Sequence, residues 1–371
     1  MEKFIITIIF IFIASLICTL SIIPQILKVI LKKQILDKPG GRKLHKNSTP
    51  SMGGVGIFFG FFLLSIFIAN GDGFNNLNYF FFALIILFFT GLRDDLLPLA
   101  PRIKLLIQIA CAIIVTGLIP LRIESLYSLN FLLGFNFPDW FSFSLTIFII
   151  IAFTNAINLI DGIDGLAGSV VFLILTALAF WFAYNSFWIY AYLSASMLGA
   201  LAGFLYYNWH PAKIFMGDTG SLIIGFSSIL FAIIFLNLNQ ELSVKNQNFK
   251  IENSVTFLIT LFIYPIFDVI RVIIIRLKGK RSPFSPDKLH IHLLLSRIGM
   301  KHNQIVAIIL FFSIVNLNIF WIFSYLKINE LIILLSIIIF CYLSNLLLEI
   351  KVKKFKKEKR LLDVRKIIKK S

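Results

Sequence analysis

The chain has 371 residues, of which 58% are hydrophobic and only 14% are charged, and its formal net charge is +17. Soluble globular domains are roughly half apolar and about a quarter charged, so the composition excludes that class and predicts a multi-pass membrane protein. In a membrane protein, an excess of basic residues is interpreted by the loops in which they lie. The net charge therefore gives no reason to expect nucleic acid as a partner. The three cysteines lie inside apolar runs without metal-ligand spacing, which argues against a disulfide framework or a thiol catalyst.

Eleven apolar segments are long enough to cross the roughly 30 Å hydrocarbon core of a membrane. We expect them at residues 4–25, 52–70, 78–93, 103–120, 140–158, 168–184, 187–207, 221–237, 254–276, 304–326 and 330–348. If the N-terminus lies outside, the inside loops and the C-terminal tail hold 29 of the 35 lysines and arginines. Positive charge marks cytoplasmic loops. The fold class predicted is therefore an all-α bundle of eleven transmembrane helices with a cytoplasmic C-terminus.

The first inside loop is strongly basic, and Gly53-Gly54 opens the helix that follows it. The start of a helix with small residues suits a phosphate group, because its backbone N–H groups and its dipole favour anions. The alternative is the ordinary positive charge of an inside loop. The basic residues of this loop are Arg42, Lys43, His45 and Lys46.

The second inside loop begins with two adjacent acids, Asp94 and Asp95. Neighbouring carboxylates at a membrane boundary repel each other, and a divalent cation or a lysine would relieve this repulsion. Lys104 and Gln108 follow four residues apart and share one helix face. An anchor that only fixes the topology is the alternative, although such an anchor is more often basic on this side.

The segment from Asn155 to Ser169 ends a long apolar run with two aspartates, two asparagines and three glycines. Asp161 and Asp164 are three residues apart, so they share a face on helical backbone. The neighbouring glycines leave that face bare, which allows a ligand to approach the backbone. A polar helix end with a glycine-rich turn is the alternative.

The fourth inside loop carries Asp218 between two glycines, ahead of a helix that Thr219 or Ser221 would cap. A plain helix cap is the alternative to a ligand for this acid. Phe215 precedes the acid and is suited either to stacking on a nucleobase or to simple packing.

The ninth apolar segment contains Asp268 and Arg271, three residues apart, which could form a buried ion pair. The loop after it combines Arg281 with His290 and His292 near Asp287, a set that suits an anionic diphosphate. A zinc site is not expected there, because no third soft ligand lies nearby.

The tail from residue 351 to residue 371 holds eleven basic residues, with apolar residues at helical spacing. This pattern indicates an amphipathic helix on the anionic lipids of the cytoplasmic leaflet, and not an arm that binds nucleic acid. We expect one integral membrane catalytic domain at residues 1–350, followed by this tail.

The polar clusters gather on one predicted membrane face, where carboxylates suit Mg²⁺ and cations suit phosphate oxygens. Phosphoryl transfer depends largely on positioning and on neutralising charge, and these groups supply both. The clusters therefore predict phosphoryl transfer at a lipid surface, between a polar donor from the cytosol and an apolar acceptor in the bilayer.

Five linked motifs resemble those of the polyprenyl-phosphate N-acetylhexosamine-1-phosphate transferases. They are Arg42-Lys-x-His45 with Pro50-x-x-Gly53-Gly54, Asp94-Asp95 with Lys104 and Gln108, Asn158-x-x-Asp161-Gly-x-Asp164-Gly-Leu, Phe215-Met-Gly-Asp218-x-Gly-Ser, and Ser285-Pro-Asp287-Lys-x-His290-x-His292. The resemblance covers nearly the whole chain, in the family's motif order and with its helix count.

This resemblance implies transfer of a sugar-1-phosphate from a UDP-amino sugar, foremost UDP-GlcNAc, onto undecaprenyl phosphate, with release of UMP. It also implies Mg²⁺, or Mn²⁺ in its place, and a bacterial inner (cytoplasmic) membrane as the location; a homodimer stays open. By analogy, Asp218 and Asp164 would bind the metal, and Asp94 and Asp95 would handle the acceptor phosphate or its proton. The remaining implied roles are diphosphate neutralisation by Lys104, organisation of the nucleotide side by Asn158 and Asp161, uracil stacking by Phe215, and substrate contacts by Arg42, His45, Arg281, His290 and His292.

The chain departs from the family pattern at Leu293, where most members have a further histidine. This difference weakens any role assigned to His292. The first motif is more similar to members that start O-antigen, teichoic acid or enterobacterial-type glycans than to the branch that uses UDP-N-acetylmuramoyl-pentapeptide.

Two alternatives remain at this point. Phospho-N-acetylmuramoyl-pentapeptide transferase activity uses the same family chemistry on a different donor. A secondary transporter would instead place polar residues along a path reachable from both sides, whereas here they crowd one side. Within the transferase chemistry, direct attack by the acceptor phosphate competes with a covalent intermediate on one of the two adjacent acids.

Overall fold

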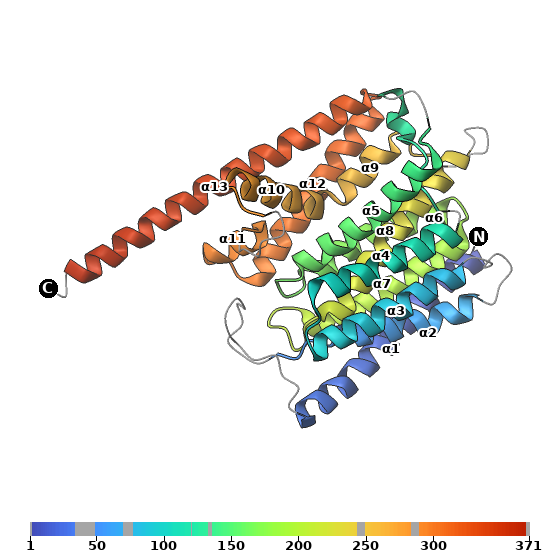
Figure 1. The fold of residues 1–371 in the computed structure, drawn as a ribbon, viewed down its shortest axis with the longest axis horizontal. Coiled ribbons are helices and arrows are strands. Elements are labelled where there is room, and N and C mark those ends of the chain that lie inside the picture. The colour runs from blue at the N-terminus through green and yellow to red at the C-terminus, as the bar shows by residue number, and fades with distance from the viewer. Residues whose placement is uncertain are drawn as a thin grey trace. The chain divides into compact units, whose positions relative to one another are not determined.

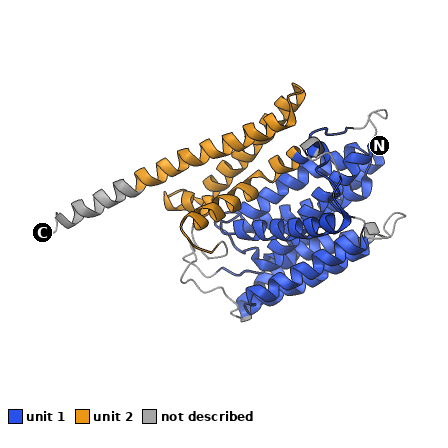
Figure 2. Cartoon of the chain, turned by 45° about the horizontal axis from the view of Figure 1, so that its top comes forward, with its two compact units in different colours: residues 1–255 blue, residues 256–371 orange. Residues whose placement is uncertain are grey.

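A computed structural model describes residues 2–33, 49–69, 77–119, 121–132, 136–242, 249–282 and 289–368. The described backbone is helical and forms no β-strand; one isolated parallel bridge joins Ser51 and Phe215. The chain divides into two compact units, residues 1–255 and 256–371, which Figure 2 colours separately. The single catalytic domain expected over residues 1–350 stays a prediction.

Unit 1 consists of long apolar helices, labelled in Figure 1. They are α1 (Glu2–Lys33), α2 (Gly53–Ala69), α3 (Leu77–Leu96), α4 (Pro101–Leu118), α5 (Asp139–Ile160), α6 (Leu166–Tyr184), α7 (Trp188–Asn208) and α8 (Gly217–Glu241), with a 3-10 helix, η1 (Tyr127–Leu132), between α4 and α5.

Helix α8 forms the core of unit 1. Every residue from Thr219 to Leu236 is buried, and the helix packs against α2, α3, α5 and α6. A helix that is apolar on all sides is stable only where protein or lipid surrounds it completely. Gly225 allows a close approach to α5, because a Cβ atom there would lie 3.1 Å from the Cα atom of Thr154. Several helices of unit 1 therefore surround α8.

Small residues and hydroxyl groups join α1, α2 and α7. The Ser15 hydroxyl on α1 lies 2.9 Å from the carbonyl oxygen of Gly60 on α2 and 2.6 Å from that of Ser196 on α7. Transmembrane helices associate through such close contacts and interhelical hydrogen bonds, because lipid supplies no hydrophobic driving force between them. These three helices therefore pack closely against one another.

Unit 2 contains α10 (Ile263–Lys278), α11 (Ile291–Arg297), α12 (His302–Tyr325) and α13 (Glu330–Ile368), and most of α9 (Ser254–Leu261). Helices α9 and α10 meet at an angle of 73°. The sequence predicted one apolar segment at 254–276, without the bend that the structure places between Leu261 and Ile263. Pro265 has no N–H to donate to the carbonyl of Leu261 one turn earlier, so the helix breaks there. Helix α13 runs without a break into the residues assigned to the tail.

Nine helices of the described part are long and apolar enough to cross a membrane, or ten if the bent pair counts as one segment. This confirms an all-helical multi-pass membrane protein. The remaining expected segment corresponds to α2, which has only 17 residues. The count of eleven and the orientation of the helices stay predictions.

Candidate active site

The first turn of α8 carries Asp218, the acid of the fourth motif. Gly217 precedes it with a φ of 73°, a left-handed conformation that favours glycine. The Asp218 carboxylate accepts a hydrogen bond from Asn158 Nδ2 at 2.6 Å and contacts the ammonium of Lys104. Asn158 also donates to the hydroxyl of Ser221 at 2.7 Å. Residues of α4 and α5 therefore meet at the start of α8, where the helix dipole favours negative charge.

Asp95, at the end of α3, caps α8 from a neighbouring helix. Its Oδ1 atom accepts the N–H of Asp218 at 2.8 Å, and its Oδ2 atom accepts the N–H of Thr219 at 3.1 Å and the Thr219 hydroxyl at 2.6 Å. Met216, the residue before α8, provides no side-chain cap. Asp95 thus satisfies N–H groups that the start of a helix leaves without an intrahelical partner. Both of its carboxylate oxygens therefore accept hydrogen bonds from the first turn of α8.

Asp94 faces a different partner from Asp95, although the two are adjacent in sequence. Its Oδ2 atom lies 3.5 Å from the Lys104 ammonium, and its Oδ1 atom accepts the N–H of Leu99 at 2.5 Å. The ammonium of Lys104 therefore contacts two carboxylates, those of Asp94 and Asp218. Both carboxylates and the lysine are only partly exposed, so water screens their interaction less than it would at the surface.

Two carboxamides on α4 and α5 extend this polar cluster. Asn155 Nδ2 donates to Gln108 Oε1 at 2.6 Å. Gln108 is buried within an apolar helix, where an unpaired amide would cost about 1–3 kcal/mol. The pair therefore fixes α4 against α5 close to the residues that hold Asp218.

Asp161 follows the last residue of α5 and lies among the other acids. Loss of hydration raises the pKa of its carboxyl well above the usual range, and the negative charges of Asp218, Asp95 and Asp164 raise it further. These interactions place Asp161 within electrostatic range of all three. A carboxyl of this kind holds its proton to a higher pH than an exposed aspartate does.

Asp164 is buried, and its carboxylate faces the loop before α8. Its Oδ2 atom lies 2.7 Å from His210 Nδ1 and 3.3 Å from the N–H of Ala212. Gly165, with a φ of 77°, follows it and donates its N–H to Asn208 Oδ1 at 2.8 Å. The sequence assigned no role to His210; its only signal was its place in the polar loop before Asp218.

The Pro50–Gly54 motif and the Phe215–Ser221 motif pair with each other through their backbones. The N–H of Phe215 donates to the carbonyl of Pro50 at 2.8 Å, and the N–H of Gly53 donates to the carbonyl of Phe215 at 2.8 Å. Gly54 N–H donates to the Met216 carbonyl at 2.9 Å. The two glycines were expected to form a phosphate seat. That expectation is corrected here, because their N–H groups bond to protein carbonyls.

The basic residues of the first motif, Arg42 and His45, lie outside the described residues, and so does Asp287. Their predicted contacts with substrate stay predictions. Phe215 is half-buried, with its backbone held on both sides as above.

In unit 2, the ion pair suggested by the spacing of Asp268 and Arg271 is replaced by other contacts. Asp268 Oδ2 lies 2.7 Å from His290 Nδ1, and Asp268 Oδ1 accepts the N–H of Ile291 at 2.7 Å. Arg271 donates to the carbonyl of Leu289 at 2.8 Å and lies 3.4 Å from the Glu349 carboxylate. Both residues thereby fix the start of α11.

The two histidines of the last motif are buried, and Arg281 is exposed. The hydroxyl of Tyr264 lies 3.0 Å from His292 Nδ1, and burial lowers the pKa of His292 to about 4. His292 therefore carries no charge near neutral pH, which removes ionic attraction as a way for it to hold a diphosphate. Its assignment as a substrate contact stays a prediction.

The carboxylates around Lys104 fit a hard divalent cation. Asp94 and Asp218 already converge on one positive charge, the lysine ammonium. Mg²⁺ is usually bound by one or two carboxylates together with substrate phosphates. Of the two ligands expected from the sequence, Asp218 belongs to this pair, whereas Asp164 contacts His210. Asp94, which the resemblance assigned to the acceptor phosphate or its proton, is the additional candidate ligand.

The chain is similar to known proteins over most of its length. Residues 77–236, which include α3, α4, α5 and the start of α8, match the family described as "Glycosyl transferase family 4". The chain is 35% identical over 302 residues to a Bacillus subtilis (strain 168) protein named "Probable undecaprenyl-phosphate N-acetylglucosaminyl 1-phosphate transferase", covering 80% of each chain.

Two further relatives carry a similar name, "Undecaprenyl-phosphate alpha-N-acetylglucosaminyl 1-phosphate transferase". The Escherichia coli (strain K12) protein is 31% identical over 301 residues, and the Salmonella typhi protein is 30% identical over 297 residues. Each alignment covers 76% of this chain and 74% of the relative. Identity at this level over most of both chains, together with the cluster at the start of α8, identifies an enzyme and removes the transporter alternative. The chain is a sugar-phosphate transferase that belongs to glycosyl transferase family 4, among the polyprenyl-phosphate N-acetylhexosamine-1-phosphate transferases.

Proposed function

We propose that the protein transfers N-acetylglucosamine 1-phosphate from UDP-GlcNAc to undecaprenyl phosphate and releases UMP. The product, a sugar linked to the lipid by a diphosphate, would be the first intermediate of a cell-surface glycan. The observation that carries the proposal is the contact of the Lys104 ammonium with both Asp94 and Asp218. The names of the relatives support the acceptor and the amino sugar.

The residues around α8 suit the two phosphate-bearing substrates. An oxygen of the acceptor phosphate attacks the β-phosphorus of the donor, and the bond from that phosphorus to the oxygen bridging to the α-phosphorus breaks. UMP leaves with the bonding electron pair. Lys104 is suited to donate hydrogen bonds to the leaving phosphate, because an ammonium stabilises the charge that develops there.

Mg²⁺ is the cofactor that we propose, with Asp218 and Asp94 as ligands and Asp164 as a further candidate. When bound, it would neutralise charge on the phosphate oxygens and polarise the phosphoryl group. Asn158 would then hold the Asp218 carboxylate in place through its hydrogen bond. Phe215 would stack on the uracil.

Direct attack is favoured over a covalent intermediate on Asp95. Both oxygens of Asp95 accept hydrogen bonds from α8, which lowers their ability to attack phosphorus. A phosphate monoester has a second pKa of about 6, so the acceptor needs little help to lose its proton near neutrality. Exchange of labelled UMP into UDP-GlcNAc without any lipid acceptor would instead require an enzyme-bound phosphosugar, and would indicate the covalent route.

The position of the label in the product provides the main test. Purified protein in detergent, undecaprenyl phosphate and Mg²⁺ are incubated with UDP-GlcNAc that carries ³²P at the β-phosphorus, and the lipid is extracted. Transfer of sugar 1-phosphate carries the label into the extracted lipid, whereas transfer of the sugar alone leaves the label in the aqueous phase. Absence of any labelled lipid from active preparations would overturn the proposal.

The controls separate a loss of the site from a loss of the fold. Asp218→Asn should abolish transfer. Asp139→Asn removes a carboxylate from the opposite end of α5, where it is exposed, and should leave transfer unchanged. A panel that includes UDP-GalNAc and UDP-N-acetylmuramoyl-pentapeptide then decides the donor. Preference for the pentapeptide donor would favour the other branch of the family.

The location follows from the same proposal. UDP-sugars are cytosolic, so we place the start of α8 on the cytoplasmic side of a bacterial inner membrane, with the basic end of α13 against anionic lipids. A membrane-impermeant reagent applied to spheroplasts should modify a cysteine introduced at Lys213, an exposed residue in the loop before α8, only after the cells are opened. Modification in intact spheroplasts would show that the protein has the opposite orientation in the membrane.

A further inference from the structure

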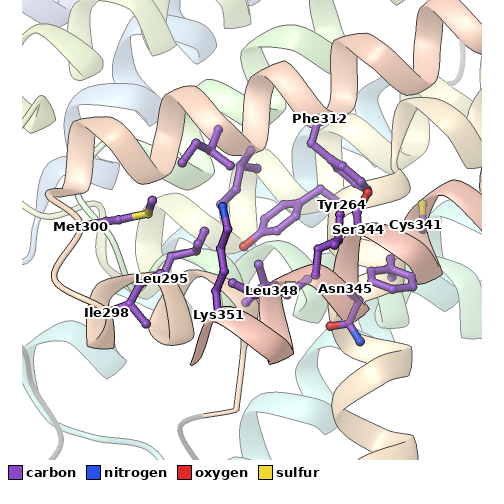
Figure 3. A pocket seen from close by; sticks show the side chains of 15 residues that line it. Tyr264, Leu295, Ile298, Met300, Phe312, Cys341, Ser344, Asn345, Leu348 and Lys351 are labelled. Atoms are coloured by element: carbon purple, nitrogen blue, oxygen red, sulfur yellow. The ribbon is translucent and has the colours of Figure 1, made fainter. Parts of the chain in front are cut away.

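Unit 2 contains a cavity of about 220 Å³ between α10, α11, α12 and α13. Figure 3 shows its wall, with Tyr264, Leu295 and Phe312 on different helices and the Lys351 side chain extending along it from α13. Pockets that enclose drug-sized ligands usually have about 300–1,000 Å³. This cavity is smaller, so it suits part of an extended molecule and not a whole sugar nucleotide.

The wall of the cavity is almost entirely apolar. Phe267, Leu295, Ile308, Phe312 and Leu348 contribute hydrocarbon surface. A hydrocarbon chain gains free energy there because its contact with water is lost, whereas a sugar or a nucleobase would lose hydrogen bonds.

Two polar side chains of the wall, those of Tyr264 and Asn345, already have partners inside the protein. The Tyr264 hydroxyl lies 3.0 Å from His292 Nδ1. Asn345 accepts a hydrogen bond from Arg271 at 2.5 Å and donates one to Glu349 at 3.1 Å. Among the described residues that line the cavity, Lys351 is the one with a charged side chain.

The cavity lies where α13 passes from apolar to basic surroundings. Leu347 and Ile350 expose 64% and 61% of their surfaces, as residues that face lipid do. Lys351 follows immediately, and Lys353 and Lys354 are exposed on the same helix. Such a change marks the boundary between hydrocarbon and headgroups, where basic residues attract anionic lipids by about 1 kcal/mol each.

We propose that this cavity is a binding site for an anionic phospholipid, with one acyl chain between α10, α12 and α13 and the phosphate beside Lys351. The apolar wall selects a hydrocarbon chain, and the cluster of lysines selects a negative headgroup over a zwitterionic one. The site lies wholly within unit 2 and shares no residue with the cluster at the start of α8. It does not depend on the identity of the sugar donor.

A photoactivatable phospholipid tests the proposal directly. The full-length protein is reconstituted with phosphatidylglycerol that carries a diazirine on one acyl chain, irradiated and digested, and the modified peptides are identified by mass spectrometry. Labelling should concentrate on the peptides that contain Phe312 and Leu348. Equal labelling along all lipid-facing helices would contradict a defined site.

Two lysines on the same helix provide a matched pair of variants. Lys351→Gln should reduce labelling at the cavity about fivefold, which corresponds to the loss of one favourable charge contact. Lys353→Gln removes the same charge from an exposed residue that does not line the cavity, and should have a smaller effect. Equal effects of the two variants would show that the lysines of α13 attract the anionic lipid without a defined site, and would overturn the proposal.

Competition decides the nature of the occupant. Unlabelled phosphatidylglycerol should displace the probe from the cavity peptides at a lower mole fraction than phosphatidylcholine does. Equal displacement by both would remove the role of the negative headgroup. Displacement by near-stoichiometric undecaprenyl phosphate, without displacement by excess phosphatidylglycerol, would assign the cavity to the polyprenyl lipid instead.

A variant that fills the cavity tests where the acyl chain binds. Ser344→Phe places a large side chain in the cavity from α13 and should abolish labelling by the acyl-chain diazirine. Persistence of that labelling would show that the chain binds elsewhere.

Discussion

Replacing Asp95 with asparagine tests whether this acid acts by holding the start of α8. In the structure its carboxylate accepts two backbone N–H groups and one hydroxyl, all from Asp218 and Thr219. Asparagine has nearly the same shape but only one acceptor oxygen, and its NH₂ group would face a backbone donor. The substitution therefore removes the negative charge and at least one hydrogen bond without creating a cavity.

The expected loss of stability can be worked from these contacts. A hydrogen bond to a charged group contributes about 1.5–3 kcal/mol, and the loss of a helix cap costs about 0.5–2 kcal/mol. Because asparagine keeps one acceptor, we expect a net loss of about 2–3 kcal/mol. Domains of about 150–250 residues change their Tm by roughly 2–4 °C per kcal/mol, which gives a decrease of about 4–12 °C for unit 1.

Thermal unfolding of the detergent-solubilised protein, measured beside transfer activity, provides the assay. Activity should fall together with Tm, because the start of α8 carries Asp218. Thr219→Val removes the hydroxyl bond to the same carboxylate, so the double variant should lose less than the sum of the two single variants, by about 0.5–3 kcal/mol. Asp139→Asn, at an exposed position on α5, serves as the control for removal of a charge.

One result would refute the capping role. If Asp95→Asn keeps the native Tm within the error of the Asp139→Asn control but abolishes transfer, Asp95 takes part in the chemistry itself. Additive effects of the Asp95 and Thr219 substitutions would likewise contradict the hydrogen bonds that the structure assigns.

Three further predictions concern other parts of the molecule. Lys104→Met should lower kcat by about 10²–10³, as loss of a transition-state donor does. It should also lower the Mg²⁺ concentration that gives the half-maximal rate, because the ammonium no longer competes for Asp94 and Asp218. An unchanged or higher Mg²⁺ requirement in rate titrations would contradict this. Phe215→Leu should raise KM for the UDP donor about 5- to 150-fold, from the loss of about 1–3 kcal/mol of base stacking, with a smaller change in kcat. His292 has a pKa of about 4 in the folded protein, below its unfolded value of about 6.5, so it contributes stability above pH 6.5 that is lost as the pH falls. A series of melting curves should show a loss of about 2 kcal/mol between pH 7.5 and pH 5. His292→Gln should make the stability depend less on pH.

The membrane class could be predicted from the sequence because the lengths of apolar runs are set by the thickness of the bilayer. The break between α9 and α10 was missed, although Pro265 was a visible signal within the ninth segment. Hydropathy averages over a window and does not detect a single missing N–H group. The apolar span was therefore predicted without its bend, because one residue, and not the overall composition, determines the backbone there.

The cluster at the active site was predicted as a set, but the individual contacts were not. Asp94 and Asp95 are adjacent and chemically identical, so the sequence alone gives them the same role. On a helix their side chains point about 100° apart, and the structure accordingly directs one to Lys104 and the other to the backbone of α8. The partnership of His210 with Asp164 depends on the path of a loop, which spacing does not reveal.

The start of α8 explains why glycines accompany the acids in these motifs. A Cβ atom at Gly91 on α3 would lie 2.5 Å from the N atom of Thr219, and one at Gly54 on α2 would lie 2.6 Å from the Thr219 carbonyl carbon. One at Gly217 would lie 2.5–2.8 Å from the Asp95 carboxylate. Only glycine therefore lets α2 and α3 approach closely enough for Asp95 to reach the N–H groups of α8. The position of Asp218 thus depends on backbone contacts between helices that are distant in sequence, and this dependence links the packing of unit 1 to the chemistry at its polar end.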